Sequence, residues 1–584
     1  MNRRGFVKAA ALVPLSAGWG PFSFASASRG EVEKGKSTDW QGAPIRQRYE
    51  LTLGRVLSGD SPAYTQEFLL ADVRPAAERR FTEFSGDLSG RYIGALASAA
   101  LVYGTKFPEL DALVERVIAL QKPDGYFGSS FQYDKPTDQD LALLWGNGRL
   151  LVGLIEYYRL KPQAQVLAAC KRLGDFLLRI GPLMLSKEMR EAFGAQHFAS
   201  SYICWMQQTE GLANLYMITK DARYRTLAEE IAAVVERRAG DHVHGYLTSL
   251  RGLMDLHTAT GDEQYLRQCE AAWHEITTSE DLLITGGVPE GWSPNNHRTE
   301  GCAEVDWVRL NLSLWKATGK PEYLSMAERA IFNELAFNQF ATGDFGHRLY
   351  SETGLPGNGA ARAWWCCTLH GLRCFPDIHT NAFRAVDGGL RYDLPIDGRI
   401  RTTDLSATAE SSLAEDGTVR IAIDVAGEKP VSIGLRKSDW ADEVSAHVKG
   451  FGQLMPLEEG YVGATRVWSA GDVIEIKYTM KLKARSNGKE RTSFTYGPWL
   501  LGASSADNPR YFNELTADNK VEPAKGEALP KTSQPGRPFA VQVAATSFPC
   551  IQAEFPDQPG TVVLRAIAEQ TGMPTTAWEL KFRT

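Results

Sequence analysis

Apolar residues recur at helical spacing through the first two thirds of this chain. The segments 151–158, 305–315 and 324–335 carry apolar residues three and four positions apart, as one face of an amphipathic helix requires. The clearest example is 88–102, with Leu88, Tyr92, Ala95, Leu96, Ala99 and Val102 on one face. The pattern predicts a large helical domain.

A weak repeat separates these helices. The hexapeptide at 219–224, which ends in Tyr224, recurs at 260–265 and 318–323. In the last two copies, Gly261 and Gly319 can end one helix in the left-handed conformation, the polar residues open the next helix, and the tyrosine docks it. Repeated helix pairs with short connections favour a helical toroid or solenoid. A closed ring of about six pairs fits roughly 300 residues and leaves a central pocket.

Long glycine-rich and aromatic loops are expected between the helices. They are predicted at 121–128, 145–148, 284–298 and 342–365. Loops of this length in a compact helical domain are usually functional. We expect them to crowd one mouth of the ring.

Near residue 386 the helical periodicity stops and short alternating runs begin. Residues 418–424, 431–435 and 473–478 alternate apolar and polar positions between turn signals, which predicts strands. Two closing strands are predicted at 562–565 and 578–582. Because helices precede strands, separate domains are favoured over an α/β layer fold. We expect a multidomain α-then-β chain, with a helical catalytic domain at 46–385 and one or more β-sandwich domains at 386–584.

Composition and charge narrow the function classes. The chain has 584 residues, 43% hydrophobic and 23% charged, enough to bury more than one core. A formal net charge of −6 gives no basic field that would favour nucleic acid or an anionic membrane as a partner. The 14 Trp and 20 Tyr are explained by packing, and more weakly by stacking on sugar rings.

The N-terminus resembles an export signal. Asn2–Lys8 contains a twin-arginine pattern, an apolar run follows over Ala9–Gly18, and Ala25–Ala27 offers a small-x-small cleavage site. The run is too short to span a membrane. We therefore expect a signal peptide at 1–27 and a mature periplasmic protein that begins near Ser28, without a membrane anchor.

The eight cysteines are too sparse for a disulfide framework in a chain of this length. The twin-arginine route exports folded proteins, so a thiolate metal site could assemble in the reducing cytoplasm before export.

Two short stretches offer a metal-ligand set. Cys366 and Cys367 are adjacent, and Glu300 and Cys302 lie two apart at the start of a predicted helix. Three thiols and a carboxylate form a full tetrahedral set for a zinc-like ion. We expect an irregular backbone at the cysteine pair, so that both thiols face one ion. The alternatives are buried small hydrophobic residues or a vicinal disulfide.

A sugar-cleaving enzyme also needs a carboxylic acid to protonate the leaving oxygen. Glu290 is the candidate, because it lies in a glycine-rich loop beside Trp292 and just upstream of Glu300. The alternative is an ordinary solvated glutamate.

In this order, these motifs resemble the β-L-arabinofuranosidase family, glycoside hydrolase family 127 and its relatives. The motifs are Gly286-Gly287 with Glu290, Thr299–Cys302 and Trp365–Thr368, supported by the loop Gln121–Gly128 and, in the β region, Leu435-Arg436, Trp440, Gly460-Tyr461, Trp468, Gly471-Asp472 and Tyr496–Pro498. The continuation Thr368–Gly371 departs from the commonest family pattern, which indicates a divergent branch.

The resemblance implies an (α/α)6 barrel followed by β-sandwich material. It also implies Zn2+ bound by Glu300, Cys302, Cys366 and Cys367. Cys366 would be the nucleophile and Glu290 the acid/base of a retaining hydrolase acting on β-L-arabinofuranosides or a related sugar. The family's pocket histidine falls on either His242 or His244.

Further substrate contacts are expected from Trp292, Trp365 and His370, for each of which a structural role is the alternative. Two other functions stay open: a polysaccharide lyase or other toroid glycosidase with a structural zinc, and a glycan-binding protein without catalysis. The partner is a carbohydrate. The oligomeric state is left open, with a homodimer among the options.

Overall fold

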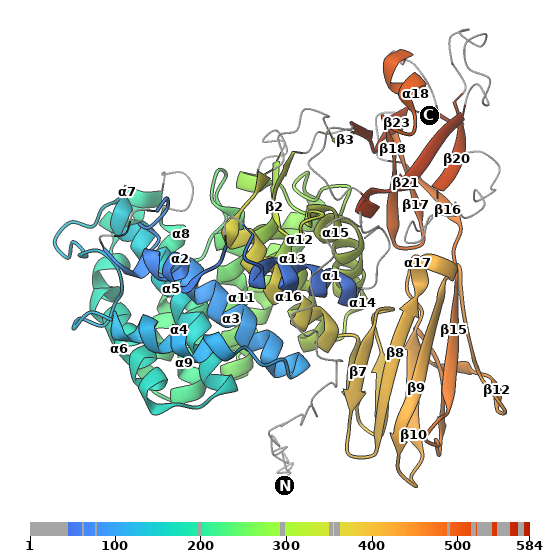
Figure 1. Cartoon of the computed structure of the whole chain (residues 1–584), viewed down its shortest axis with the longest axis horizontal. Helices are drawn as coiled ribbons and strands as arrows, with labels where there is room; N and C mark the ends of the chain where they lie inside the picture. Colours follow the sequence, from blue (N-terminus) through green and yellow to red (C-terminus); the bar gives the residue numbers. More distant parts are fainter. Residues whose placement is uncertain are drawn as a thin grey trace, which may run out of the picture.

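The computed structural model describes residues 45–583 except 61–62, 76, 78, 195–200, 293–297, 350–353, 356–361, 487–490, 515–520, 523–539, 546–560 and 570–576. The expected signal peptide at 1–27 lies outside these residues. In Figure 1 the helices form one body and the strands lie beside it, in the predicted order of helices first and strands second.

Six helices form the inner ring of the helical domain. They are α3 (Asp87–Tyr103), α5 (Asp138–Leu160), α9 (Gln208–Thr219), α11 (Val243–Thr260), α13 (Gly301–Thr318) and α16 (Trp365–Thr380). Each packs on the next, and α16 returns to α3. Each is backed by an outer helix: α4 (Pro108–Ala119), α6 (Ala164–Met184), α10 (Ala222–Ala232), α12 (Glu263–Thr278), α14 (Pro321–Arg329) and α1 (Ile45–Leu57). The predicted (α/α)6 barrel is confirmed.

The three copies of the predicted repeat form the short connections between an inner helix and the outer helix that follows it. Gly261 and Gly319 end α11 and α13 in the left-handed conformation, with φ of 73° and 68°. In the first copy Lys220 takes this conformation itself, with φ of 59°. Asp262 then caps α12 by accepting a hydrogen bond from the Gln264 amide, which satisfies one of the free donors of the first turn.

The predicted loop at Trp145–Gly148 is wrong, because these residues lie inside α5. Their glycines serve close packing instead of a turn. A Cβ on Gly146 would lie 2.4 Å from the Phe84 carbonyl oxygen. The same applies further along α5, where a Cβ on Gly153 would lie 2.1 Å from the Gly90 carbonyl oxygen. The glycines let α3 and α5 approach closely at the wall of the ring.

Two facing sheets follow the barrel and form a β-sandwich. One has the strand order β13 (Met455–Glu458), β14 (Tyr461–Arg466), β10 (Val431–Arg436), β6 (Gly389–Tyr392), β5 (Phe383–Val386). The other has the order β12 (Gly452–Gln453), β11 (Glu443–Val448), β15 (Val473–Thr479), β9 (Thr418–Ala426), β8 (Leu405–Ser412), β7 (Gly398–Arg401). The strands predicted at 418–424, 431–435 and 473–478 are confirmed as β9, β10 and β15. Their alternating apolar residues, such as Ile421, Ile433 and Ile474, are buried.

A further sheet at the C-terminal end contacts the barrel. Its strands run in the order β16 (Leu482–Ser486), β17 (Arg491–Tyr496), β18 (Trp499–Ser504), β21 (Thr561–Ala566), β20 (Ala540–Ala545), β19 (Val521–Glu522). The closing strand predicted at 578–582 is divided into β22 (Trp578–Glu579) and β23 (Phe582–Arg583). β22 also pairs with β3 (Gly354–Leu355), a strand that belongs to the barrel.

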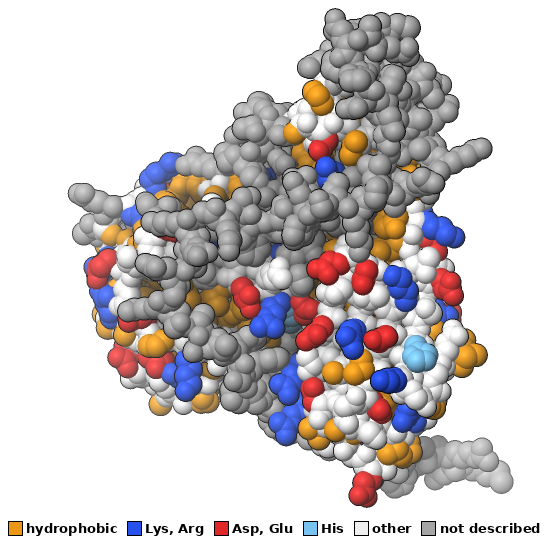
Figure 2. Space-filling view, turned by 45° about the vertical axis from the view of Figure 1, so that its right-hand side comes forward, with side chains coloured by type: hydrophobic (Ala, Val, Ile, Leu, Met, Phe, Trp, Pro, Cys, Tyr) orange, Lys and Arg blue, Asp and Glu red, His pale blue; other side chains and the backbone are white. Residues whose placement is uncertain are grey.

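The surface carries both signs of charge. Figure 2 shows Lys and Arg side chains interspersed with Asp and Glu over the face of the β-sandwich. Among the described residues, no helix has the length and apolarity needed to cross a membrane.

The close contact between α3 and α5 gives a stability test. Gly153→Ala places a methyl group against the Gly90 backbone, which cannot move aside, so we expect a loss of about 2–3 kcal/mol in the free energy of unfolding. Gly54→Ala is the matched control, because Gly54 lies in α1 with no atom near its added Cβ. This control should be neutral or stabilise by up to about 1 kcal/mol. Denaturant melts measure both, and equal stability of Gly153→Ala and wild type would contradict the packing account.

Candidate metal and active site

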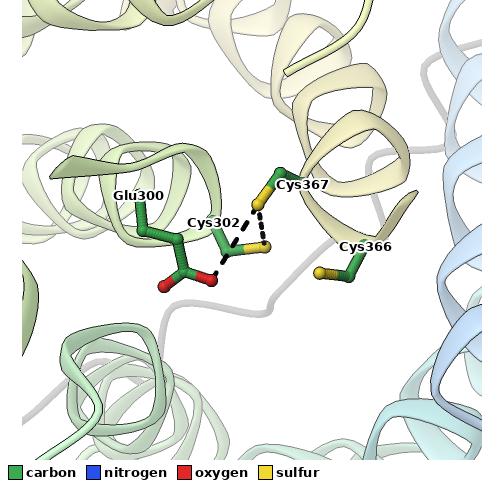
Figure 3. Close-up of side chains that lie close together, drawn as sticks. All are labelled: Glu300, Cys302, Cys366 and Cys367. Atoms are coloured by element: carbon green, nitrogen blue, oxygen red, sulfur yellow. Dashed lines mark hydrogen bonds between the residues drawn. The ribbon is translucent and has the colours of Figure 1, made fainter. Parts of the chain in front are cut away.

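Two helix N-termini bring the predicted ligands together. β1 (Arg298–Glu300) leads directly into α13, so Glu300 and Cys302 flank the start of that helix. α16 begins at Trp365, which places Cys366 and Cys367 in its first turn. Figure 3 shows the four side chains converging on one point. The prediction of an irregular backbone at the cysteine pair is wrong, because Cys366 and Cys367 lie in a regular α-helix. Neighbouring side chains of an α-helix point about 100° apart. In the first turn, both can therefore face one point beyond the N-terminal end of the helix.

The donor atoms have the spacing of a four-coordinate site. The Cys302 and Cys367 Sγ atoms lie 3.5 Å apart, and the Cys367 Sγ atom lies 3.9 Å from Glu300 Oε1. All four ligand atoms, including Cys366 Sγ, lie within 4.8 Å of one another. Zinc–sulfur bonds of 2.3 Å in a tetrahedron place sulfur atoms about 3.8 Å apart. Cys366 and Cys367 are free thiols rather than a vicinal disulfide. The cluster could therefore hold a metal ion.

The three thiols differ in their acidity. Hydrogen bonds from the Cys302 and Cys367 thiols, together with the Arg91 charge, hold the pKa of Cys366 well below its ordinary value. Burial raises the pKa values of Cys302 and Cys367. A helix N-terminus also favours negative charge on its first-turn side chains. Cys366 is thus the thiol most disposed to be a thiolate, and it is the partly exposed one of the three.

A cavity of about 340 Å³ opens in front of Cys366. Its walls are mainly aromatic and charged, which suits a polar ligand that also has an apolar face. The residues that line it are Arg79, Phe81, Glu83, Phe84, Asp87, Leu88, Arg91, Trp145, His242, His244, Arg298, Glu300, His347, Trp364, Trp365 and Cys366. The structure therefore brings the predicted residues His242, His244, Trp365, Glu300 and Cys366 to one cavity.

Glu290 lies behind His242 and Glu300. Its Oε1 atom is 4.0 Å from His242 Nε2, which in turn lies 3.1 Å from Glu300 Oε2. Burial, and next the Glu300 carboxylate, raise the pKa of Glu290 to about 8. Burial acts to raise the pKa of Glu300 as well, but the charge and hydrogen bond of His242 bring it well below its ordinary value. Near neutral pH these pKa values favour a protonated Glu290 and an ionised Glu300. Such a difference between two neighbouring carboxyl groups is typical of a pair in which one group acts as an acid.

Asp306 organises the floor beneath the cavity. Its Oδ2 atom lies 2.7 Å from His244 Nδ1, and its Oδ1 atom lies 3.0 Å from both His370 Nε2 and Arg251 Nη1. The other ring nitrogen of His244 lies 2.9 Å from Arg91 Nη2. This chain of contacts fixes both histidine rings and connects them to Arg91, whose Nη1 atom lies 3.6 Å from Cys302 Sγ.

Two predicted substrate residues lie away from the lining. His370 is buried against Asp306. Trp292 packs edge-on against Tyr246 and beneath the Arg237 guanidinium. Among the described residues, the cavity is lined without either of them, and also without Glu290, which lies behind His242 and Glu300.

Several site residues were missed by sequence reasoning. Asp87 and Arg91 form an ion pair of 2.7 Å in the first two turns of α3. Their signal was available, because two charges four residues apart interrupt an otherwise apolar helix. Phe81 also lines the cavity, and its backbone has a left-handed conformation with a φ of 63°. Nothing in the surrounding sequence predicts this conformation. Asp306 and Arg298 carried no signal that separates them from surface residues.

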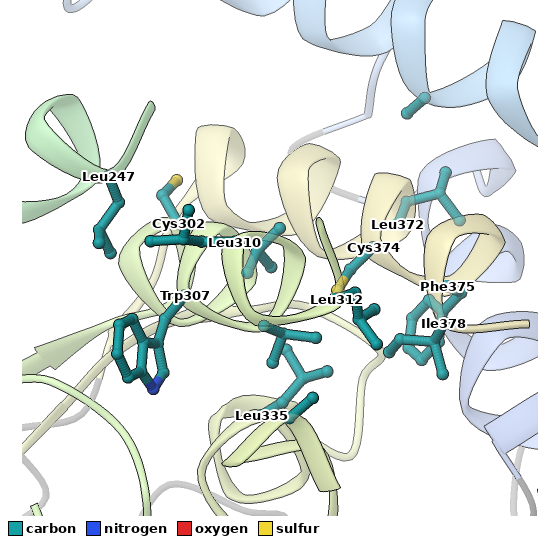
Figure 4. Packing of buried hydrophobic residues seen from close by; sticks show 14 of the residues in the cluster. Leu247, Cys302, Trp307, Leu310, Leu312, Leu335, Leu372, Cys374, Phe375 and Ile378 are labelled. Carbon is teal, nitrogen blue, oxygen red and sulfur yellow. The ribbon is translucent and has the colours of Figure 1, made fainter. Parts of the chain in front are cut away.

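Cys374 is a buried residue of the hydrophobic core. Figure 4 shows it among Leu312, Leu372 and Phe375 where α13 and α16 pack together. It is fully buried, and burial raises the pKa of its thiol above the ordinary range.

Two family models match the chain. Residues 60–380 match the beta-L-arabinofuranosidase GH127 catalytic domain, and residues 394–480 match the GH127 middle domain. The chain belongs to glycoside hydrolase family 127. As a member of that family with its catalytic domain, it is a glycoside hydrolase, which argues against the alternative of a non-catalytic glycan-binding protein.

Solved structures share the whole architecture. A GH127 beta-L-arabinofuranosidase from Geobacillus stearothermophilus T6 is 18% identical, with a TM-score of 0.68 over 92% of this chain and 98% of that one. A second GH127 beta-arabinofuranosidase is 16% identical, with a TM-score of 0.65 over 92% of each chain. A third structure, titled a glycoside hydrolase, is 18% identical, with a TM-score of 0.62 over 86% of this chain and 94% of that one. No curated protein matches in sequence.

Asp306 gives a test of the buried charge network. Asp306→Asn leaves Arg251 and the two histidines without their shared anion, so we expect a loss of about 3–5 kcal/mol in the free energy of unfolding. The control is Asp424→Asn in the β-sandwich, whose partly exposed pair with Arg399 should contribute less than about 1 kcal/mol. Thermal melts compare them, and a similar small loss in both variants would show that Asp306 does not organise the floor.

Proposed function

We propose that this protein is a retaining glycoside hydrolase that uses the Cys366 thiolate as its nucleophile and Glu290 as its acid/base. The observation that supports this most directly is the position of Cys366. It is the cluster thiol that faces the cavity, and hydrogen bonds from the Cys302 and Cys367 thiols, together with the Arg91 charge, lower its pKa.

Zn2+ is the metal that the donor set favours. Thiolates select soft or borderline ions, and three sulfurs with one carboxylate suit tetrahedral zinc. Glu300, Cys302, Cys366 and Cys367 would hold the ion. When bound, zinc supplies positive charge that keeps the coordinating thiols deprotonated at neutral pH.

In the first step the Cys366 sulfur attacks the anomeric carbon of the sugar. The bond from that carbon to the leaving oxygen breaks, and Glu290 gives its proton to the departing oxygen. Its raised pKa keeps Glu290 protonated near neutral pH and therefore ready to donate. The product is a thioglycosyl enzyme.

In the second step Glu290, now a carboxylate, takes a proton from water. The water oxygen bonds to the anomeric carbon, the carbon–sulfur bond breaks, and the Cys366 thiolate returns. Two displacements at one carbon retain its configuration. His242 Nε2 lies 3.1 Å from Glu300 and 4.0 Å from Glu290, and its charge and hydrogen bond lower the pKa of Glu300 and keep that group ionised.

We assign the substrate to β-L-arabinofuranosides or a related sugar, on the names of the relatives with similar structures. Trp145, Trp364 and Trp365 line the cavity and offer faces on which a sugar ring can stack. His242 lines the same cavity and is placed to contact sugar hydroxyl groups, and His244 lines it with its two ring nitrogens held by Asp306 and Arg91. The twin-arginine pattern at Asn2–Lys8 supports action in the periplasm.

Metal analysis tests the ligand set. We expect about one zinc per chain in the wild type and loss of stoichiometric zinc in Cys302→Ala, because three donors are left where a closed site needs four. Cys374→Ala is the matched control, since it removes a buried thiol on α16 outside the cluster and should keep the metal. Zinc-free wild type, or equal zinc in both variants, would reject the site.

Leaving-group dependence tests Glu290. Glu290→Gln should lower kcat/KM by about 10²-fold or more for a glycoside with a poor leaving group, because that reaction needs the proton. An activated aryl glycoside should lose much less. Glu83→Gln, which alters an exposed carboxylate lining the same cavity, should show no such split. If Glu83→Gln shows the split and Glu290→Gln does not, the acid is assigned to the wrong residue.

A further inference from the structure

A π-helical turn connects the C-terminal sheet to the active site. The turn η5 (Ala330–Leu335) continues α14 and precedes α15 (Ala336–Asn338). Such turns are rare and occur mostly where a helix must redirect side chains. Here two successive buried residues, Asn333 and Glu334, contact different parts of the molecule.

Asn333 binds the C-terminal sheet. Its Nδ2 atom donates to the Pro498 carbonyl oxygen at 2.9 Å, and its Oδ1 atom accepts from the Leu500 amide at 2.6 Å. One side chain thereby satisfies two backbone groups at the turn between β17 and β18. A buried amide with both groups paired is a specific attachment, because either group left unpaired would be costly.

Glu334 binds the two segments that carry the acidic residues of the site. It accepts a hydrogen bond from Thr299 Oγ1 at 2.9 Å, and Thr299 directly precedes Glu300. Its side chain also packs against Gly287 in the loop that carries Glu290, where an added Cβ would lie 2.4 Å from Glu334 Cγ. The same stretch of helix therefore contacts the C-terminal sheet through one residue and the active site through the next.

The beginning of the Glu290 loop is fixed by further contacts. Arg329, at the end of α14, donates from Nη2 to the carbonyl oxygens of Leu283 and Ile284 at 3.2 and 2.8 Å. Glu304 Oε1 accepts from the Val288 amide at 3.2 Å. The loop between 283 and 288 is thus attached to helices α13 and α14.

A small hydrophobic core separate from the main one covers this loop from the other side. It contains Leu283 and Phe337 from the barrel, with Leu500, Ile567, Trp578 and Leu580 from the C-terminal sheet; Ile284 packs against it. The barrel contributes the beginning of the Glu290 loop, and the C-terminal sheet contributes most of the cover. β22, which contains Trp578, also pairs with β3 in the segment that leads to the cysteine pair. Figure 1 shows β3 beside β18 and β23.

We propose that the C-terminal sheet is a positioning element for catalysis, which holds the Glu290 loop in place through the Asn333 attachment and the core around Trp578. The inference rests on the proposed role of Glu290. Surface loops are mobile unless they are packed and hydrogen-bonded, and a general acid that is displaced by about 1 Å can lose much of its effect. Asn333 and Trp578 are positioning residues, since each acts on the Glu290 loop through its contacts with neighbouring segments.

The test compares Asn333→Ala and Trp578→Ala with Trp468→Ala in the full-length protein. Trp468 is a buried tryptophan of the β-sandwich whose indole donates to the Val431 carbonyl oxygen, so its loss destabilises that domain and leaves the Asn333 hydrogen bonds and the core around Trp578 in place. Three readouts are taken: hydrogen exchange of residues 283–292, zinc content, and kcat/KM for a poor and an activated leaving group.

We expect Asn333→Ala and Trp578→Ala to speed up exchange at 283–292 by about tenfold or more. We also expect them to lower kcat/KM by about tenfold for the poor leaving group, and much less for the activated one. Zinc content should stay at the wild-type level. Trp468→Ala should show neither the faster exchange nor the split. If Trp578→Ala does not fold, Asn333→Ala, which removes hydrogen bonds and little volume, carries the test.

The outcomes separate the two proposals. Unchanged exchange at 283–292 in a folded Asn333→Ala variant overturns the positioning role, whatever the activity. An equal fall for both leaving groups also overturns it, because that result means general destabilisation. If Glu290→Gln in the same assay shows no leaving-group split, the proposed acid is wrong, and the exchange data alone decide whether the sheet holds the loop.

Discussion

The structure depends on charge balance at one buried point. Three thiols and a carboxylate meet there, and together they carry a charge of about −4 when deprotonated. Arg91 divides its charge between Cys302 and Asp87, and His242 serves both Glu300 and Glu290. Protein cations therefore leave the cluster short of positive charge, and a divalent ion is the component that would complete it.

The closed ring explains how residues distant in sequence reach that point. Helices α13 and α16 are neighbours in the ring, and their N-termini lie at the same end. Glu300 and Cys302 therefore meet Cys366 and Cys367 without any linking motif in the sequence. The loop with Glu290 is brought to the same place and packed between the barrel helices and the C-terminal sheet. The C-terminal sheet therefore contacts the segments that form the active site, in addition to contributing to the stability of the chain.

Much of this fold could be predicted from the sequence, because local signals specify it. Gly261 and Gly319 mark helix ends that the structure confirms, and alternation at 418–424 specifies β9. The loop predicted at Gly146 was wrong because, in the sequence, a glycine needed for close packing against a neighbouring backbone cannot be distinguished from a glycine needed for a turn. The cluster ligands could be proposed from their residue types and the family resemblance. Asp306 and Asn333 could not, because burial and partners from distant segments give them their roles.

The central claim is that Cys366 forms a covalent bond to the sugar. The most direct measurement is peptide mass spectrometry after acid quench of wild-type enzyme during turnover of a slow β-L-arabinofuranoside with an activated leaving group. The account predicts one glycosyl group on the peptide that contains Cys366, with fragmentation placing it on Cys366 rather than Cys367. A glycosyl group on a carboxylate, or rapid turnover with no adduct on any residue when breakdown of the intermediate limits the rate, would contradict it.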